Sequence, residues 1–178
     1  MNSAIEDGAQ LLLIGGRSGV GKTTVANEVS EQLQAAGVAH CVIDGDNLDA
    51  AHPKPAGDPD GTGLTETNLT AMWTTYAAAG YHRLIYVNTV SVLEAEMITR
   101  SMGGSVAVRA VLLTAAHDTV RTRLEHREVG SALAVHLDRS RTRAAQLDRA
   151  AGADVVRLVT DARSVREVAA DVVTASGW

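Results

Sequence analysis

The chain has 178 residues and a formal net charge of −5, with 46% hydrophobic and 21% charged residues. This length suits one soluble domain with its own core, and the acidic balance argues against a broadly basic surface for nucleic acid. No apolar run approaches the length of a membrane span and the N-terminus does not resemble a signal peptide, so we expect a cytoplasmic protein without membrane or nucleic-acid partners.

Five short apolar runs alternate with helix-like segments along the chain. The runs cover residues 11–14, 38–43, 84–87, 106–113 and 155–159, and continuous apolar character is typical of strands buried on both faces of a parallel sheet. Helices are expected at 22–36 and 69–79, from Ser91 to near Gly103, at about 116–127 and 132–150, and after Ser164. This alternation predicts one α/β domain over residues 1–178, with three layers around a five-stranded parallel sheet.

Local signals refine these boundaries. Ser91 and Ser164 are each followed three residues later by a glutamate, which is the spacing of a helix capping box. Residues 52–63 contain all 3 prolines of the chain, among several glycines and aspartates. Such composition is typical of a loop, so we expect a flexible segment there. The single cysteine, Cys41, has no partner for an internal disulfide and lies in an apolar run, which predicts a buried thiol.

The residues after the first run form a phosphate-binding motif. They fit G-x-x-x-x-G-K-[ST] between a strand and an apolar-periodic helix, the context in which backbone N–H groups and a helix N-terminus bind phosphates. We expect Lys22 to reach the β- and γ-phosphates of ATP and the Thr23 hydroxyl to bind Mg²⁺. Thr24 follows as a further nucleotide contact, or as a packing or capping residue. The complete candidate set is Gly16, Arg17, Ser18, Gly19, Val20, Gly21, Lys22, Thr23 and Thr24.

Two carboxylates follow the second apolar run, in the sequence Asp44-Gly45-Asp46-Asn47. Ligands of open parallel sheets bind beyond the carboxyl ends of the strands, so both carboxylates should face the phosphate loop. Phosphoryl transfer needs a metal to neutralise charge and a base to orient the attacking hydroxyl. We assign Asp46 as the base and Asp44 as the residue that holds the metal through water. The reverse division of roles, and an ordinary Asp-Gly turn, remain alternatives.

The phosphate loop, the acidic pair and the five-strand pattern resemble the small P-loop kinases, which include adenylylsulfate, gluconate and shikimate kinases and related antibiotic phosphotransferases. The resemblance covers most of the chain and implies a nucleoside-monophosphate-kinase-like fold with a short helical lid. The Asp44–Asn47 segment is most similar to adenylylsulfate kinases, in which the acidic residues face the acceptor and the metal. The arginine- and asparagine-rich segment expected to follow is absent, and a proline-rich stretch stands in its place on the substrate side.

The resemblance extends to the lid and to the adenine site. Arg123-Leu124-Glu125-His126-Arg127 looks like the R-L-x-x-R segment in which the first arginine lies against adenine and the second reaches the phosphates. A guanidinium can do either, and a solvated helix face is the alternative. The lid itself would cover residues 128–136. The loop from Thr160 to Arg163, with Thr160 and Asp161 at its start, resembles the segment that borders adenine, mostly through backbone atoms.

These features predict an ATP- and Mg²⁺-dependent kinase that transfers the γ-phosphate to a hydroxyl of a metabolite, antibiotic or nucleoside. The alternative is a nucleotide-binding regulatory ATPase without small-molecule transfer. A GTPase is disfavoured, because the guanine motif N-K-x-D is missing and the D-x-x-G matches at Asp58 and Asp60 lie in the proline-rich loop. Arg100 lies where related kinases often hold an acidic substrate, with a surface role as the alternative. The sequence does not indicate the acceptor or the oligomeric state.

Overall fold

The computed structural model describes residues 8–127 and 133–178 and confirms the predicted α/β fold. Its sheet has the strand order β2-β3-β1-β4-β5, and every neighbouring pair is parallel. All strands therefore end at the same edge of the sheet, where the phosphate loop begins. The strands are β1 (Ala9–Gly15), β2 (Cys41–Asp44), β3 (Arg83–Val87), β4 (Val106–Thr114) and β5 (Val156–Val159).

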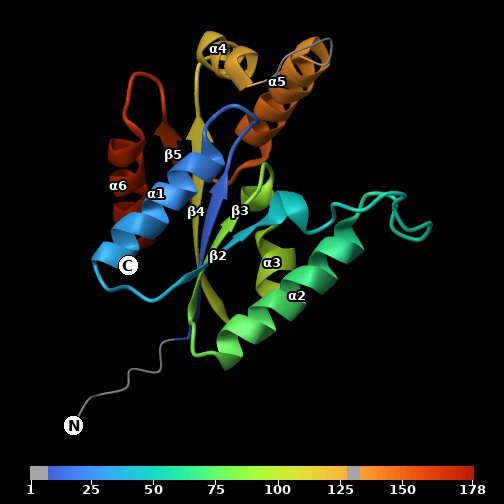
Figure 1. The fold of residues 1–178 in the computed structure, drawn as a ribbon, viewed down its shortest axis with the longest axis vertical. Coiled ribbons are helices and arrows are strands. Elements are labelled where there is room, and N and C mark those ends of the chain that lie inside the picture. Colours follow the sequence, from blue (N-terminus) through green and yellow to red (C-terminus); the bar gives the residue numbers. More distant parts are fainter. Residues whose placement is uncertain (1–7, 128–132) are drawn as a thin grey trace.

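Helices cover both faces of this sheet and complete three layers. Figure 1 shows α1 and α6 on one face, α2 and α3 on the other, and α4 and α5 toward the end where the strands terminate. None of the helices in the described part of the chain combines the length and apolar character that a bilayer crossing requires. The helices are α1 (Lys22–Ala35), α2 (Thr62–Ala78), α3 (Ala95–Ser101), α4 (His117–Arg127), α5 (Leu133–Ala150) and α6 (Val165–Ser176), with 3₁₀ turns η1 (Gly45–Asn47) and η2 (Ser91–Leu93).

The core is aliphatic and lies on both faces of the sheet. Side chains alternate along β1, so that Leu11 and Leu13 pack toward α2 and α3, while Leu12 and Ile14 pack toward α1 and α6. All four are fully buried. This two-sided burial explains why the strand appears in the sequence as a continuous apolar run.

Three predicted boundaries were wrong. The second strand begins at Cys41 instead of residue 38, because the backbone N–H of Val38 still donates to Leu33 at 2.9 Å and closes the end of α1. Helix α2 begins at Thr62, well before Leu69, so Thr62 and Gly63 belong to the helix and not to the loop. The cause is Asp58, whose carboxylate accepts from the N–H groups of Gly63 and Leu64 at 3.1 and 2.8 Å.

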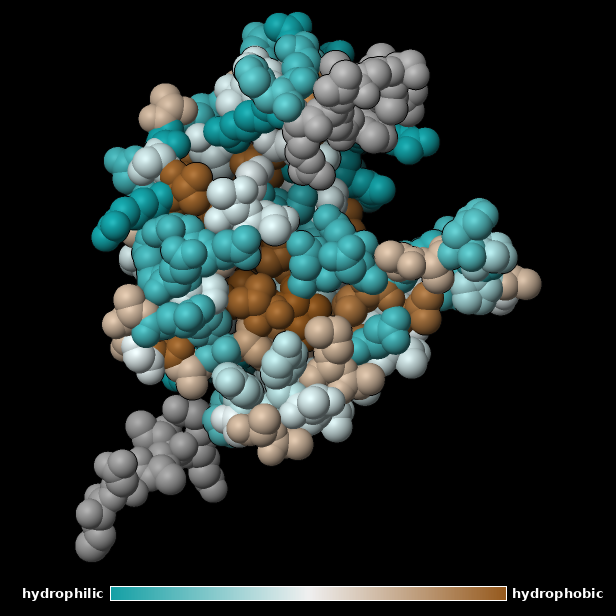
Figure 2. All heavy atoms as spheres, viewed as in Figure 1, coloured by the Kyte–Doolittle hydropathy of each residue, from teal (hydrophilic) through white to brown (hydrophobic). Residues whose placement is uncertain are grey.

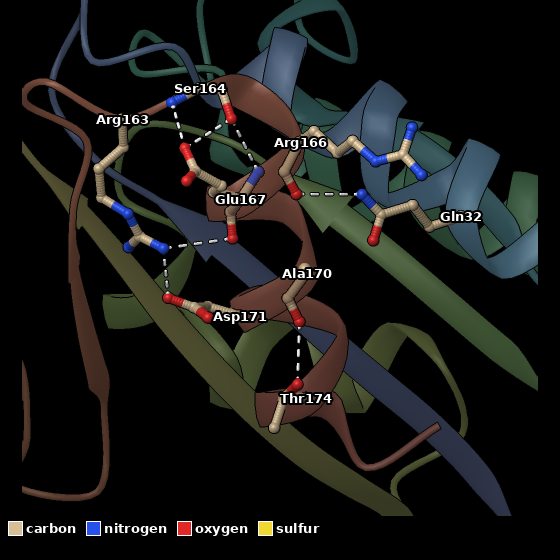
Figure 3. A network of polar contacts seen from close by, with 8 residues as sticks. All are labelled: Gln32, Arg163, Ser164, Arg166, Glu167, Ala170, Asp171 and Thr174. Carbon is tan, nitrogen blue, oxygen red and sulfur yellow. Dashed lines mark hydrogen bonds and ion pairs between the residues drawn. The ribbon is translucent and has the colours of Figure 1, made fainter.

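The third wrong boundary is the helix start at Ser91. Of the two predicted capping boxes, the one at Ser164 forms and the one at Ser91 does not. Ser164 forms its box with Glu167, since each side chain accepts a backbone N–H of the other, at 3.2 and 2.9 Å (Figure 3). Ser91 instead starts η2, and α3 begins only at Ala95 without a side-chain cap. The Ser91 hydroxyl is fully buried because η2 packs against Gly15 at the end of β1.

The predicted lid, residues 128–136, lies mostly outside the described residues. Its last four residues form the first turn of α5, and their side chains are also outside the description. Cys41 is buried, as expected. Burial raises the pKa of its thiol to about 11, which keeps it protonated and unreactive at neutral pH.

Candidate active site

The phosphate loop joins β1 to α1 at the carboxyl edge of the sheet. Gly21 adopts φ 101°, a left-handed conformation that side chains rarely adopt, and it precedes the first residue of α1. Gly19 has φ 83° and packs so closely on α4 that a Cβ there would lie 2.8 Å from Val120. The two glycines therefore allow the backbone N–H groups to turn toward a ligand at the positive end of α1.

A cavity of about 390 Å³ opens beside this loop, within the usual size range of small-molecule sites. Lys22 is 8% exposed and forms part of the wall. The cavity brings together residues that are distant in sequence, as the parallel topology predicts. Its lining includes Ser18, Gly19, Val20, Gly21, Lys22, Thr23, Thr24, Asp46, Thr89, Arg123, Thr160 and Arg163.

Thr23, which lines the cavity, contacts Asp44 at the end of β2. The Thr23 hydroxyl donates to Oδ2 of Asp44 at 3.4 Å, and Oδ1 of Asp44 accepts the backbone N–H of Asp46 at 3.0 Å. Hydroxyl and carboxylate oxygens are ligands that Mg²⁺ prefers, and Mg²⁺ usually takes its other ligands from phosphates and water. The described residues contain no group of three or more His, Cys, Asp or Glu side chains that could hold a metal alone. The pair therefore fits a magnesium ion that arrives with a nucleotide.

Asp46 is exposed at the cavity wall, next to this pair. Desolvation of the carboxyl at the cavity wall raises its pKa although the residue as a whole is exposed, Lys22 opposes this rise, and the negative charge of Asp44 adds to it. A carboxylate with a raised pKa accepts a proton more readily than an ordinary aspartate. This property is useful in a residue that receives the proton of an attacking hydroxyl.

Arg123 and Thr160 form the other side of the cavity. Nη1 of Arg123 donates to the Val20 carbonyl at 3.1 Å and to the Thr160 hydroxyl at 3.0 Å, and Nη2 donates to the Thr160 carbonyl at 3.2 Å. The guanidinium thus ties the phosphate loop to the end of β5. Its planar group is held by the protein itself, in an orientation set by two backbone carbonyls.

Four other candidate residues are not among the described residues that line the cavity. The Asp161 carboxylate accepts the N–H of Ala116 at 3.0 and 3.1 Å, before α4 begins, and a hydrogen bond from Thr119 is the main cause of its lowered pKa. Gly16 packs on β4, where a Cβ would lie 2.7 Å from the Leu113 carbonyl. Arg17 is buried, and its side chain contacts Ser140 in α5. Arg127 is the last residue of α4, and its side chain lies outside the description.

Sequence reasoning assigned no role to two side chains near this site, although one of them, Arg163, lies in the segment expected to border adenine. Arg163 lines the cavity and is held by Asp171 at 2.7 Å and by the Glu167 carbonyl at 3.3 Å (Figure 3). Its position just after Thr160 and Asp161 is a signal that could have identified it. Ser140 is 3% exposed and donates to the Ser18 carbonyl at 2.9 Å. No local sequence pattern indicates this contact.

The chain is similar to known proteins in sequence and in fold. A model of the AAA domain family matches residues 11–153. No curated protein gives a significant match to the sequence. Among solved structures, a gluconokinase from Sinorhizobium meliloti 1021 aligns with a TM-score of 0.60 at 18% identity, over 96% of this chain and 92% of its own.

Two further structures have the same fold. The APS kinase CysC of Mycobacterium tuberculosis, solved with AMPPNP and APS, aligns with a TM-score of 0.58 at 21% identity, over 96% of this chain and 98% of its own. The tunicamycin resistance protein of Deinococcus radiodurans aligns with a TM-score of 0.59 at 18% identity, over 93% and 94% of the two chains. The resemblance to small P-loop kinases is thus confirmed for the fold.

Proposed function

Because the chain belongs to the AAA domain family and has the fold of the small P-loop kinases, we propose that it transfers the γ-phosphate of ATP to a hydroxyl of a small molecule. The observation that carries this proposal is the contact of Thr23 with Asp44, next to a cavity lined by Thr23, Lys22 and Asp46. A metal-binding pair, a phosphate-binding lysine and a proton acceptor are the parts that phosphoryl transfer requires.

In this proposal, each residue has a separate role in binding phosphate or in moving a proton. Backbone N–H groups of residues 18–21 and the Lys22 ammonium hold the phosphates and stabilise negative charge as it develops. Asp46 orients the acceptor hydroxyl and receives its proton while the oxygen attacks the γ-phosphorus. The bond between that phosphorus and the bridging oxygen breaks, and ADP leaves with the electron pair. Asp46 then releases the proton to solvent.

The remaining candidate residues would bind and orient the nucleotide. Thr23 and Asp44 would hold Mg²⁺, which when bound neutralises phosphate charge. Arg123, Thr160 and the backbone at Asp161 would border the adenine, and Arg127 would reach the phosphates, as the resemblance implies. Closing a lid over residues 128–136 would exclude water and so limit wasteful hydrolysis of ATP.

A coupled ADP-release screen over hydroxylated metabolites, antibiotics and nucleosides tests this function. A compound that stimulates ADP release should lose its effect at least 100-fold in Asp46→Asn, while MgATP affinity measured by calorimetry stays near that of the wild type. Asp154→Asn is the matched control, because that exposed carboxylate precedes β5 and does not line the cavity. A regulatory ATPase would instead show no acceptor-dependent release and an unchanged Asp46→Asn variant.

A further inference from the structure

A second, smaller recess of about 110 Å³ lies next to the nucleotide cavity. The two share a wall, built where β2 and β3 end. Gly45 and Asn88 line the recess, whereas the next residue of each segment, Asp46 and Thr89, lines the nucleotide cavity. A molecule in the recess therefore lies beside the residue assigned as the base, which is where an acceptor has to be.

The recess carries negative charge. The other lining residues are Asp49, Asp60, Thr62, Thr65, Glu94 and Met97, so the described lining contains three carboxylates and no basic side chain. Asp49 is neutralised by Lys54, whose Nζ lies 2.5 Å from its Oδ2. Asp60 and Glu94 have no such ion pair among the described residues. The recess thus favours a cationic ligand and repels an anionic one.

Glu94 is half-buried, and its carboxylate has no hydrogen-bond donor within the described ranges. Burial raises its pKa, and Arg143 opposes this rise through space. The Arg143 guanidinium itself donates to Gln146 at 2.7 Å. A partly buried carboxylate without a donor is unfavourable, because it has lost part of its hydration and gained no partner. A ligand that supplies a charged donor would relieve that cost.

The Tyr86 hydroxyl gives an independent indication of a ligand. Tyr86 is fully buried in β3, and its hydroxyl has no hydrogen-bond partner in the described structure. It lies directly behind Gly45, because a Cβ at that position would overlap the hydroxyl and would come within 3.1 Å of Nδ2 of Asn88. Gly45 and Asn88, the two neighbours of the hydroxyl, line the recess. Tyr86 itself does not line the recess, so its hydroxyl would gain a partner from a ligand only if the Gly45 turn shifted slightly on binding.

Arg100, the basic residue that would favour an acidic acceptor, forms an ion pair outside the recess. Nε of Arg100 contacts Oε1 of Glu66 at 2.7 Å on the exposed side of α2 and α3. This bond raises the pKa of Arg100 and lowers that of Glu66, so both groups stay charged and neutralise each other.

Figure 2 shows the surface hollowed between the upper helices and the projecting loop that precedes α2, and the loop residue Asp60 lines the recess.

We propose that this recess binds the acceptor through a protonated amine, so that the acceptor is a small amino alcohol or an amino sugar. The turnover part of this inference rests on the proposed kinase function, whereas the binding part does not. The ammonium would lie against Glu94 and Asp60, the Asn88 amide would contact a neighbouring polar atom, and a hydroxyl of the same molecule would face Asp46. A small shift of the Gly45 turn would let the Tyr86 hydroxyl reach the ligand as well. A carboxylate or sulfate at this place would meet negative charge.

Matched ligands test the proposal. Serinol and glycerate each differ from glycerol in one group, and glucosamine and glucuronate each differ from glucose in one group. Calorimetry with the MgADP-loaded protein should give at least tenfold tighter binding for the amine than for the neutral member, and none for the acid. Glu94→Gln should reduce the advantage of the amine at least fivefold, whereas the exposed control Glu96→Gln on α3 should not.

Tyr86→Phe provides a second variant that keeps the packing of β3. It should weaken binding of the amine severalfold without lowering Tm, because the hydroxyl it removes has no partner in the folded protein. Equal or tighter binding of the neutral or acidic members, or no binding of either amine, would overturn the proposal. If other acceptors still stimulated ADP release, the proposed kinase function would be supported although the recess proposal had failed. Conversely, amine binding without ADP release from any compound would support the recess and contradict the kinase function.

Discussion

Arg17 in the phosphate loop donates through Nε to the Ser140 hydroxyl at 2.9 Å, and that hydroxyl donates in turn to the Ser18 carbonyl at 2.9 Å. The link joins the phosphate loop to α5, which begins within the segment predicted as the lid. Arg17 is 6% exposed and has no carboxylate partner among the described residues. Burial lowers its pKa, so the protein holds a cation inside at some cost.

Ser140→Ala should therefore be destabilising. It leaves Nε of the buried Arg17 without its closest acceptor, for which we expect a loss of about 1–3 kcal/mol in urea unfolding. ATP affinity should also fall severalfold, because the Ser18 carbonyl that shapes the loop loses its donor. The control is Ser105→Ala, an exposed serine before β4. Equal stabilities of the two variants would show that the link to α5 is energetically unimportant.

Thr23→Val should weaken magnesium-dependent nucleotide binding. The change preserves the shape of the side chain and removes the hydroxyl that donates to Asp44, so we expect about a tenfold loss of MgATP affinity. Thr23→Ser keeps the hydroxyl and should bind as the wild type does. Calorimetry with and without Mg²⁺ measures the effect. If valine were tolerated in the presence of Mg²⁺, Thr23 would not be a metal ligand.

The raised pKa of Asp46 predicts the pH dependence of turnover. The base has to be ionised, so kcat/KM should fall as pH decreases through this pKa, at a higher pH than an aspartate with the ordinary value of 3.8 would give. A pH profile of ADP release measures this. A profile that stays flat down to pH 4 would exclude Asp46 as the base.

The raised pKa of Asp46 also predicts how this residue's contribution to stability changes with pH. Since the folded state binds the Asp46 proton more tightly than the unfolded chain does, the stabilisation is complete below the ordinary pKa and is lost as pH rises through the raised one. Asp46→Asn should therefore raise Tm, by no more than a few degrees for this exposed group. The difference should grow from pH 4 to pH 8 in thermal melts, and a lower Tm at pH 8 would contradict the assigned direction.

Arg123→Lys should lower nucleotide affinity although the charge is kept. A lysine cannot donate at the same time to Val20 and Thr160 or present a planar face to adenine, so we expect roughly a tenfold rise in the Kd for ATP. Arg121→Lys is the matched control on the same helix, where the exposed guanidinium pairs with Asp118 and Glu125. Similar affinities for the two variants would remove Arg123 from the nucleotide site.

Local patterns predicted the elements of the fold well and their ends less well. The apolar runs identified all five strands, because two-sided burial in a parallel sheet demands continuous hydrophobic sequence. The start of α2 was missed because its cap, Asp58, lies inside a loop rich in turn-forming residues. The capping box at Ser91 failed because packing against Gly15 buries the serine, and tertiary contacts override a local preference.

The sequence by itself determined the phosphate loop, because its glycines, lysine and threonine are contiguous and act through their own backbone. Only the tertiary structure decided which other distant residues meet there. Ser140 reaches Arg17 and Tyr86 lies behind the recess at Gly45, whereas the approach of Asp44 to Thr23 was expected from the strand ends. Such contacts depend on strand order and on the packing of helices over the sheet, which are set by the whole chain and by no local pattern.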